Sequence, residues 1–296
     1  MSELKKIGFI GTGIMGAAMA GHLMDAGFEV SVYNRTKSKA QKLIERGARW
    51  CETAGDCAKG QDVVITIVGY PKDVEQVYLS EGGIVDSAKA GAFLVDMTTS
   101  SPIVAEKIYN AAKAKNLNAV DAPVTGGDTG AKNATLTIFV GGDENSFDAL
   151  KPVFEVLGKN IVYEGSAGAG QKTKIANQIA LAGALAGAAE AFAYAKAAGL
   201  DVEKVYAAIS KGSASSIQMT DILSRGLLNN NFNPGFMVKH LAKDLAIGNE
   251  TATSYGQALP ILGIVLHELR KLEKDGNGAE GTQAILKYYG VASEET

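Results

Sequence analysis

Cysteine is scarce in this sequence: Cys51 and Cys57 are the only two in 296 residues. They lack CxxC spacing, and no neighbouring residues would complete a metal site with them. We therefore interpret both as reduced, structural thiols, and we predict a cytoplasmic protein without a bound metal.

Neither sign of charge is in excess, because 29 Lys and Arg residues are balanced by 32 Asp and Glu residues. Proteins that bind nucleic acid concentrate basic residues on one face, and this composition gives no electrostatic reason to expect one. We expect a small molecule as the ligand.

A long hydrophobic run is also missing. The candidate Ile175–Ala189 has no charged residue, but it is shorter than the roughly 20 residues that a bilayer core requires. We therefore expect no membrane span. The run lies within a predicted helix, Ala167–Ala198, that is apolar on every face and should occupy the centre of a helical domain.

A glycine-rich turn stands between a strand and a helix near the start of the chain. The strand is Ile7–Ile10, and the turn is Gly11, Thr12, Gly13, Ile14, Met15 and Gly16, before a helix to about Ala26 and a second strand. A GxGxxG motif in this setting predicts a dinucleotide site, with the pyrophosphate resting on the helix N-terminus. The alternative is a tight turn without a ligand.

The residues after the second strand indicate which dinucleotide binds. An NAD site places Asp or Glu roughly 20 residues beyond the first glycines, where it accepts from the ribose 2′-hydroxyl. This chain has Asn34, Arg35 and Thr36 there, which suit a 2′-phosphate. We expect NADP rather than NAD; the alternative is a solvated, basic helix start.

Strands and helices alternate as far as residue 164. We expect further helices at Lys37–Arg46, Lys72–Leu79, Ile103–Lys115 and Glu144–Leu157, and strands at Arg49–Cys51, Asp62–Val68, Ala92–Asp96, Thr135–Gly141 and Asn160–Tyr163. This alternation predicts an α/β Rossmann domain, a doubly wound parallel sheet, over residues 1–164. Ligands of such sheets bind at the carboxyl ends of the strands, where Val68 stands.

Beyond residue 165 the pattern is helical throughout. Helices are expected at Ala167–Ala198, Val202–Lys211, Ser216–Gly226, Val238–Thr253, Ala258–Lys274 and Glu280–Tyr289. We predict a second, all-α domain over residues 165–296.

Two polar residues, Lys174 and Asn177, stand one turn apart near the start of the long helix and project from one face. A lysine in a cleft suits proton transfer near neutral pH, because burial changes its pKa readily. A solvated lysine in a first helical turn is the alternative.

A Thr-Gly-Gly turn follows the strand that ends at Pro123. Successive N–H groups in such a turn form a concave anion site, and a hydroxyl adds a donor. Thr125, Gly126 and Gly127 are therefore candidates to bind a carboxylate, with a plain hairpin turn as the alternative.

Four motifs occur in order along the chain: Gly11–Gly16, Asp121–Gly127, Gly168–Asn177 and Lys239–Leu245. Together they resemble the β-hydroxyacid dehydrogenase family over nearly the whole chain. The resemblance implies a Rossmann domain, a helical second domain with a long interdomain helix, and homodimers or homotetramers formed through that second domain.

The resemblance also assigns roles. Lys174 matches the catalytic lysine, and Asn177 matches its polar companion. Thr125 begins the turn that matches the family's Ser-Gly-Gly carboxylate site, with threonine in place of serine. Thr99 matches a cofactor-contacting threonine, and Lys243 matches a second-domain lysine that closes over the nicotinamide cofactor.

The implied function is an NADP(H)-dependent oxidoreductase that interconverts a small hydroxy acid and its semialdehyde or keto acid, with Lys174 as general acid and base. Imine reductases share this architecture but commonly lack the lysine. A dinucleotide-binding scaffold that performs no chemistry is a further alternative, and it too would not need Lys174.

Overall fold

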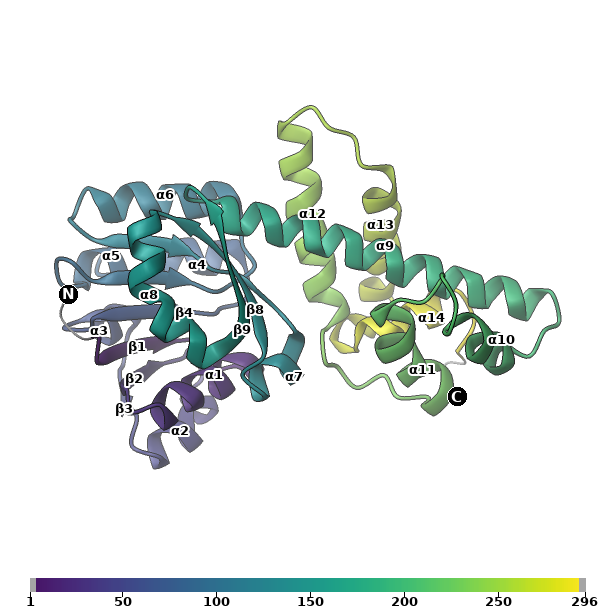
Figure 1. Cartoon of the computed structure of the whole chain (residues 1–296), viewed down its shortest axis with the longest axis horizontal. Coiled ribbons are helices and arrows are strands. Elements are labelled where there is room, and N and C mark those ends of the chain that lie inside the picture. The colour runs from purple at the N-terminus through teal and green to yellow at the C-terminus, as the bar shows by residue number, and fades with distance from the viewer. Residues whose placement is uncertain (1–3, 293–296) are drawn as a thin grey trace. The chain divides into compact units, whose positions relative to one another are not determined.

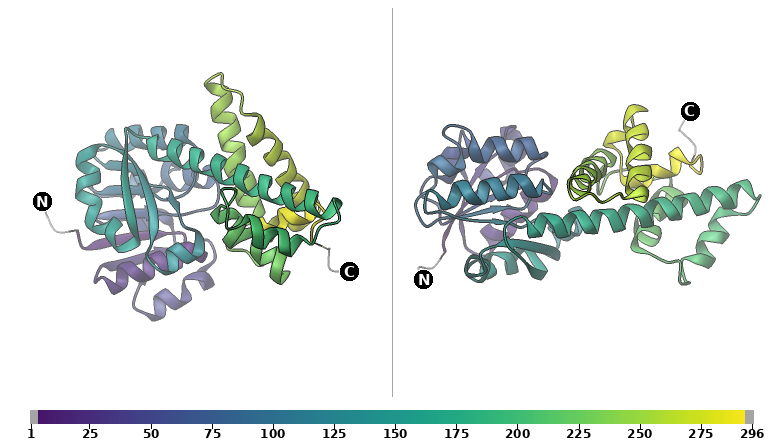
Figure 2. Two further views of the ribbon diagram at one scale, coloured as in Figure 1. Left: turned by 45° about the vertical axis from the view of Figure 1, so that its right-hand side comes forward. Right: turned by 90° about the horizontal axis from the view of Figure 1, so that it is seen from above.

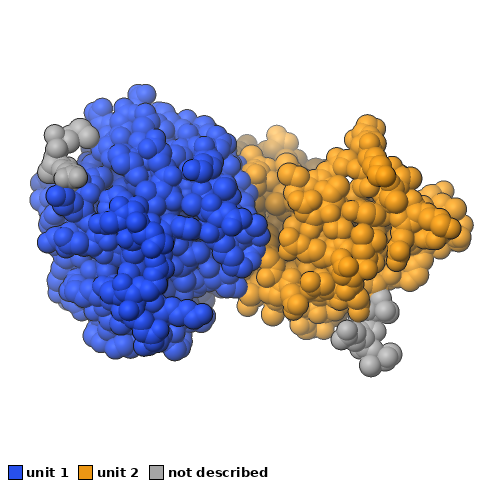
Figure 3. Space-filling model, turned by 60° about the horizontal axis from the view of Figure 1, so that its bottom comes forward, with its two compact units in different colours: residues 1–174 blue, residues 175–296 orange. Residues whose placement is uncertain are grey.

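The computed structural model describes residues 4–292, and the chain divides into two compact units, residues 1–174 and residues 175–296 (Figure 3). The sequence pattern places the boundary between residues 164 and 165, where the strands end. The compact units divide later, inside helix α9 (Ala169–Ala197), because the start of α9 is bonded to Asp121 at the end of a strand of the first unit.

Six parallel strands form the body of the first unit. They are β1 (Lys6–Ile10), β2 (Glu29–Tyr33), β3 (Arg49–Trp50), β4 (Val63–Thr66), β5 (Phe93–Asp96) and β6 (Asn118–Asp121). Their order in the sheet is β3-β2-β1-β4-β5-β6 (Figure 1). This is the order of a dinucleotide-binding Rossmann sheet, so the predicted fold class is confirmed.

Beyond β6 the sheet changes direction. β7 (Val124–Thr125) continues the line of β6 past Pro123, β8 (Leu136–Gly142) runs antiparallel to both, and β9 (Gly158–Gly165) is parallel to β8. A parallel return needs a crossover of roughly a dozen residues or more. Since little more than the short helix α7 (Gly127–Lys132) lies between β7 and β8, the chain returns antiparallel.

Helices cover both faces of the sheet (Figure 1). One face carries α1 (Ile14–Asp25), η1 (Lys37–Ala40), α2 (Gln41–Glu45), α7 and α8 (Glu144–Leu157); the other carries α3 (Ala54–Ala58), α4 (Pro71–Leu79), α5 (Ile84–Ser87) and α6 (Pro102–Lys113). Successive side chains of a strand point to opposite faces. Val64 therefore packs in one core with Tyr78, while Ile65 packs in the other with Phe154.

The second unit is helical. It contains most of α9, then α10 (Val202–Ile209), the π-helical turn η2 (Gln218–Leu223), α11 (Ser224–Asn229), α12 (Val238–Ser254), α13 (Pro260–Lys274), η3 (Asn277–Ala279), η4 (Thr282–Ala284) and α14 (Ile285–Tyr288). Figure 2 shows α9 as one unbroken helix. Leu185 and Phe192 of α9 enter a core with Leu245 and Leu269.

The prediction that α9 is buried on every side is wrong. Ala176, Ala180, Gly187 and Tyr194 are exposed along one face, so its apolar composition reflects small exposed residues as well as a buried face. Within residues 4–292, α9 is also the one helix whose length and composition would suit a membrane span. Core helices pass the same test, and its other face packs in the core described above.

Candidate functional site

In the βα turn, Gly11 and Gly16 are required by close backbone contacts, whereas Gly13 is not. Gly11 has φ +100°, and a Cβ there would lie 2.1 Å from the Ile67 carbonyl oxygen; a Cβ on Gly16 would lie 1.9 Å from the Gly11 carbonyl oxygen. Neither position therefore has room for a side chain. A Cβ on Gly13 would meet nothing within 4 Å. Gly13 thus keeps open the space in front of α1, which a ligand could use.

The N-terminus of α1 is suited to an anion. Gly13 is its N-cap and makes no side-chain cap bond, and the first turn, with Ile14 and Met15, has no acidic residue. The Thr12 hydroxyl is buried, and no hydrogen-bond partner for it occurs among the described residues. Open N–H groups and an unsatisfied hydroxyl fit a pyrophosphate at this turn.

Asn34 connects this turn to the end of β2. Its Oδ1 accepts from the Thr12 backbone N–H at 3.1 Å, and its Nδ2 donates to the Thr36 carbonyl at 2.9 Å. The next residue, Arg35, is 76% exposed and pairs with Asp73 at 3.1 Å. Asp73 also accepts from the Tyr70 N–H at the start of α4. The guanidinium is thus accessible, with a carboxylate on one side.

Two strand ends are joined where a ligand is expected. The Val68 N–H donates to the Thr98 hydroxyl at 3.0 Å, and the Thr98 N–H donates to Asp96 at 3.1 Å. Thr99 follows, between the buried Thr98 and Ser100. The predicted residues Val68 and Thr99 therefore lie at one edge, beyond β4 and β5.

The first turn of α9 is fixed by a buried carboxylate. Asp121, at the end of β6, accepts from the Gly168 N–H at 2.7 Å and from the Gln171 N–H at 2.8 Å. Burial raises its pKa to about 6, because desolvation of the carboxylate outweighs these bonds and Asp96 adds a like charge. Lys174 lies one turn beyond Gln171 and is 5% exposed. The alternative interpretation of Lys174 as a solvated lysine is therefore wrong.

A chain of polar groups joins two further predicted residues within the second unit. The Asn177 amide donates to Gln178 at 2.9 Å, and the Gln178 amide donates to Asp244 at 2.6 Å. Lys243 pairs with Asp244 at 3.0 Å, with both side chains no more than 10% exposed. Asn177 and Lys243 are therefore held in one network.

The Thr125 turn leads into a helix, so the plain hairpin alternative is wrong. Thr125 ends β7 opposite Thr137, and Gly126, with φ +126°, is the N-cap of α7. Gly127 has φ +61°. Asp128, the charge that follows the turn, pairs with Lys132 at 3.0 Å. This pairing reduces the repulsion that a bound carboxylate would meet.

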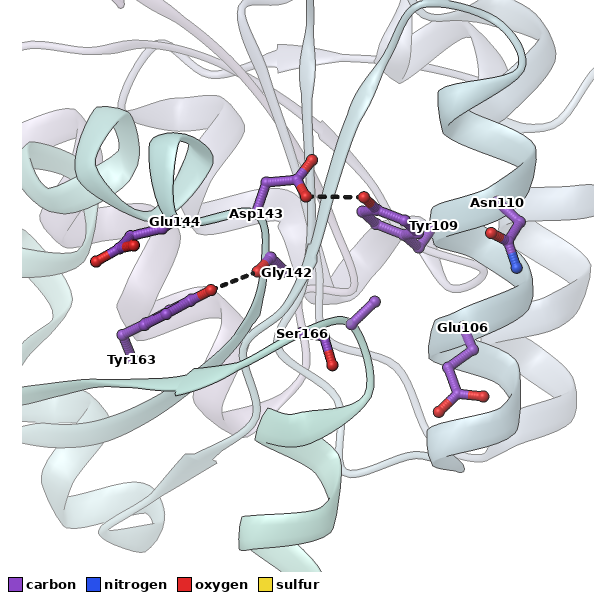
Figure 4. A pocket seen from close by; sticks show the side chains of 9 residues that line it. Glu106, Tyr109, Asn110, Gly142, Asp143, Glu144, Tyr163 and Ser166 are labelled. Carbon is purple, nitrogen blue, oxygen red and sulfur yellow. Dashed lines mark hydrogen bonds between the residues drawn. The ribbon is translucent and has the colours of Figure 1, made fainter.

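A cavity of about 480 Å³ lies elsewhere in the first unit (Figure 4). Its walls come from α6, the end of β8, the start of α8, and β9 with the turn that follows it, and include none of the predicted site residues. The Tyr109 hydroxyl donates to Asp143, and the Tyr163 hydroxyl donates to the Gly142 carbonyl. Within residues 4–292 no cluster of three His, Cys, Asp or Glu could hold a metal ion.

Four further residues contribute to these networks without a role predicted from the sequence: Asp121, Gln171, Gln178 and Asp244. Asp121 lies inside a recognised motif, and Gln171 and Gln178 are polar residues in a largely apolar helix. That contrast was the available signal, because a buried amide needs partners.

Two family models match consecutive parts of the chain. The NAD binding domain of 6-phosphogluconate dehydrogenase matches residues 6–165. The model described as NAD-binding of NADP-dependent 3-hydroxyisobutyrate dehydrogenase matches residues 168–289.

Individual proteins are similar over nearly the whole length. An uncharacterized oxidoreductase of Bacillus subtilis, YkwC, is 49% identical, covering 96% of this chain and 99% of the relative. A probable 3-hydroxyisobutyrate dehydrogenase-like 1, mitochondrial, of Arabidopsis thaliana is 47% identical, covering 95% and 84%. The structure of Mycobacterium tuberculosis 3-hydroxyisobutyrate dehydrogenase with L-serine has a TM-score of 0.88 at 28% identity, covering 96% and 99%.

Proposed function

Since this chain belongs to the β-hydroxyacid dehydrogenase family of NAD(P)-dependent oxidoreductases, we propose that it uses NADP(H) to interconvert a small hydroxy acid and its semialdehyde or keto acid. The observation that carries the proposal is Lys174, a buried lysine on a helix whose first turn is bonded to the ends of two strands of the nucleotide-binding sheet.

Lys174 acts as the general acid in the reducing direction. When bound, NADPH would supply a hydride to the substrate carbonyl carbon. The carbonyl oxygen then gains negative charge and needs a proton, which the Lys174 ammonium donates. In the oxidising direction the neutral amine takes the hydroxyl proton. Asn177, one turn further along α9, is the companion that orients the same oxygen.

The Thr125 turn holds the substrate carboxylate in this proposal. The Thr125 hydroxyl and the N–H groups of Gly126 and Gly127 are donors of the kind that bind anions. The relative crystallised with L-serine, itself a small 3-hydroxy acid, supports a substrate of this size.

Preference for NADP over NAD is proposed from the residues after β2. No carboxylate stands at positions 34 to 36, where an NAD site would accept from the ribose 2′-hydroxyl. Arg35 is exposed and can turn from Asp73 to a 2′-phosphate, which a guanidinium binds in a two-pronged fashion. Asn34 and Thr36 add further donors.

The proposal includes a homodimer or homotetramer formed through the second unit. The exposed face of α9 consists mainly of small residues and Tyr194, with one charged residue, Glu190, and Ile261 of α13 lies against Gly183 of that helix. Ile261 and Ile264 are 64% and 59% exposed. A face of this apolar character supports burial against a second copy of the chain.

NADPH oxidation over glyoxylate, succinic semialdehyde, methylmalonate semialdehyde and tartronate semialdehyde tests the function. We expect saturable oxidation with at least one of them. A chain that binds NADPH yet oxidises it with none would be a scaffold, and turnover confined to cyclic imines would identify an imine reductase.

A further inference from the structure

Gln171 makes three hydrogen bonds to two separate segments of the first unit, the end of β6 and residues 98–100. It is fully buried. Its backbone N–H donates to Asp121, its side-chain Nε2 donates to the Thr98 carbonyl at 2.7 Å, and its Oε1 accepts from the Ser100 N–H at 2.8 Å. The side-chain amide therefore bonds the carbonyl of the residue before Thr99 and the N–H of the residue after it.

The segment held in this way belongs to the expected cofactor site. Thr99 stands between the two residues that Gln171 bonds. Thr98 in turn accepts from the Val68 N–H, so the ends of β4 and β5 and the start of α9 form one connected set of bonds. Lys174 follows Gln171 by one helical turn, on the same side of α9.

The side chain of Gln171 is not needed to cap α9. Asp121 already accepts hydrogen bonds from the backbone N–H groups of Gly168 and Gln171. These bonds do not depend on which side chain residue 171 carries. The amide acts on the Thr98–Ser100 segment instead. Its effect is to fix the distance between that segment and Lys174.

We propose that Gln171 is a positioning residue for the reaction, which locks the cofactor-contacting Thr99 segment to the helix turn that carries Lys174. This rests on the proposed function, because Lys174 has its role there and Thr99 is expected from the family resemblance to contact the same cofactor. Gln171 itself touches neither substrate nor cofactor. Loss of the lock displaces the proton donor relative to the cofactor while leaving the Thr125 carboxylate turn in place.

The first test compares Gln171→Leu with Gln171→Glu. Leucine is similar in size and removes both side-chain bonds, so we expect kcat to fall about 10- to 100-fold, as a displacement of about 1 Å in an active site can cause. KM for the aldehyde should stay within about threefold, because no bond joins Gln171 to Thr125. A rise in KM with kcat unchanged would overturn the proposal.

The glutamate variant gives a pH signature that loss of packing does not. A protonated carboxyl can donate to Thr98 and accept from Ser100, as the amide does. An ionised carboxylate has no donor, and its negative charge repels the Thr98 carbonyl oxygen. The quantity to follow is the kcat of Gln171→Glu divided by the kcat of the wild type, because the ratio removes titrations that both proteins share, such as those of Asp121 and Lys174. This ratio should rise toward one as the pH falls. A flat ratio below one contradicts the proposal. This test remains available if Gln171→Leu does not fold.

A comparison with Lys174→Ala distinguishes the positioning role of Gln171 from the role of Lys174 itself. If Gln171 acts by positioning Lys174, adding Gln171→Leu to Lys174→Ala should lower kcat by less than about threefold, since linked residues are not additive. Multiplicative losses would overturn the positioning role. Normal turnover of Lys174→Ala alone would instead reject the proposed role of Lys174 as proton donor, whatever Gln171→Leu does.

Discussion

Arg35 lies at the surface with its guanidinium beside Asp73, and the proposed preference for NADP rests mainly on its chemistry. An arginine bound to a phosphate makes strong, charge-assisted bonds, and a carboxylate in its place repels the phosphate but accepts from a ribose hydroxyl. The proposed preference for NADP can therefore be tested at this one exposed side chain.

We predict that Arg35→Asp weakens NADPH binding about 10- to 100-fold, the equivalent of a lost charge-assisted hydrogen bond, while NADH affinity changes little. Fluorescence titration with each dinucleotide measures this. Arg35→Gln is the matched control, because it removes the cation without placing a second carboxylate beside Asp73. Unchanged binding of both dinucleotides would show that residues 34 to 36 do not read the phosphate.

At the scale of the element, the start of α9 depends on a carboxylate buried under two N–H donors. The pKa of Asp121 is raised from its ordinary value of 3.8 to about 6. The native state therefore holds the proton more tightly than the unfolded state does. The stability contributed by Asp121 is complete below about pH 4 and declines as the pH rises through about 6.

We predict that the free energy of unfolding of Asp121→Asn, relative to the wild type, rises between pH 4 and pH 7. The rise is at most about 3 kcal/mol, since each pKa unit corresponds to about 1.4 kcal/mol. Denaturant unfolding at a series of pH values measures the difference. Asparagine loses the acceptor for Gln171, so the offset at low pH is destabilising. A difference that falls with pH would mean that the N–H bonds outweigh burial.

Elements with a long local pattern could be predicted from sequence. Ile7–Ile10 and the glycine motif predicted β1 and α1, and the charge-free run predicted α9 within two residues of either end. Helices α3, α5 and α7 were not predicted, because four to six residues do not repeat a 3.6-residue period. The antiparallel direction of β8 depends on how little chain separates it from β7, which residue type alone does not reveal.

For the candidate site, too, only the residues with a local sequence pattern could be predicted. Glycines with positive φ and a lysine in an apolar helix are recognisable locally. The partners that hold them are not, because Gln171 reaches Thr98 and Ser100 across more than seventy residues. Such contacts exist only once the sheet has formed.

At the scale of the whole molecule, the exposed apolar face of the second unit bears on assembly. We predict that Ile264→Glu converts the proposed oligomer to a monomer, since a buried charge without a partner opposes association. Sedimentation equilibrium measures the mass. Ile103→Glu, at a residue of α6 that is 52% exposed, is the matched control and should leave the mass unchanged. An oligomer that persists in Ile264→Glu would place the interface elsewhere.

The most direct test of the account is the single-turnover rate of NADPH oxidation by Lys174→Ala, measured with NADPH affinity on the same preparation. We predict a rate lower by roughly 10²–10⁴-fold, the range for a lost acid–base group, with NADPH affinity within about twofold of the wild type. A rate close to that of the wild type at equal NADPH occupancy would contradict the assignment of Lys174 as the proton donor.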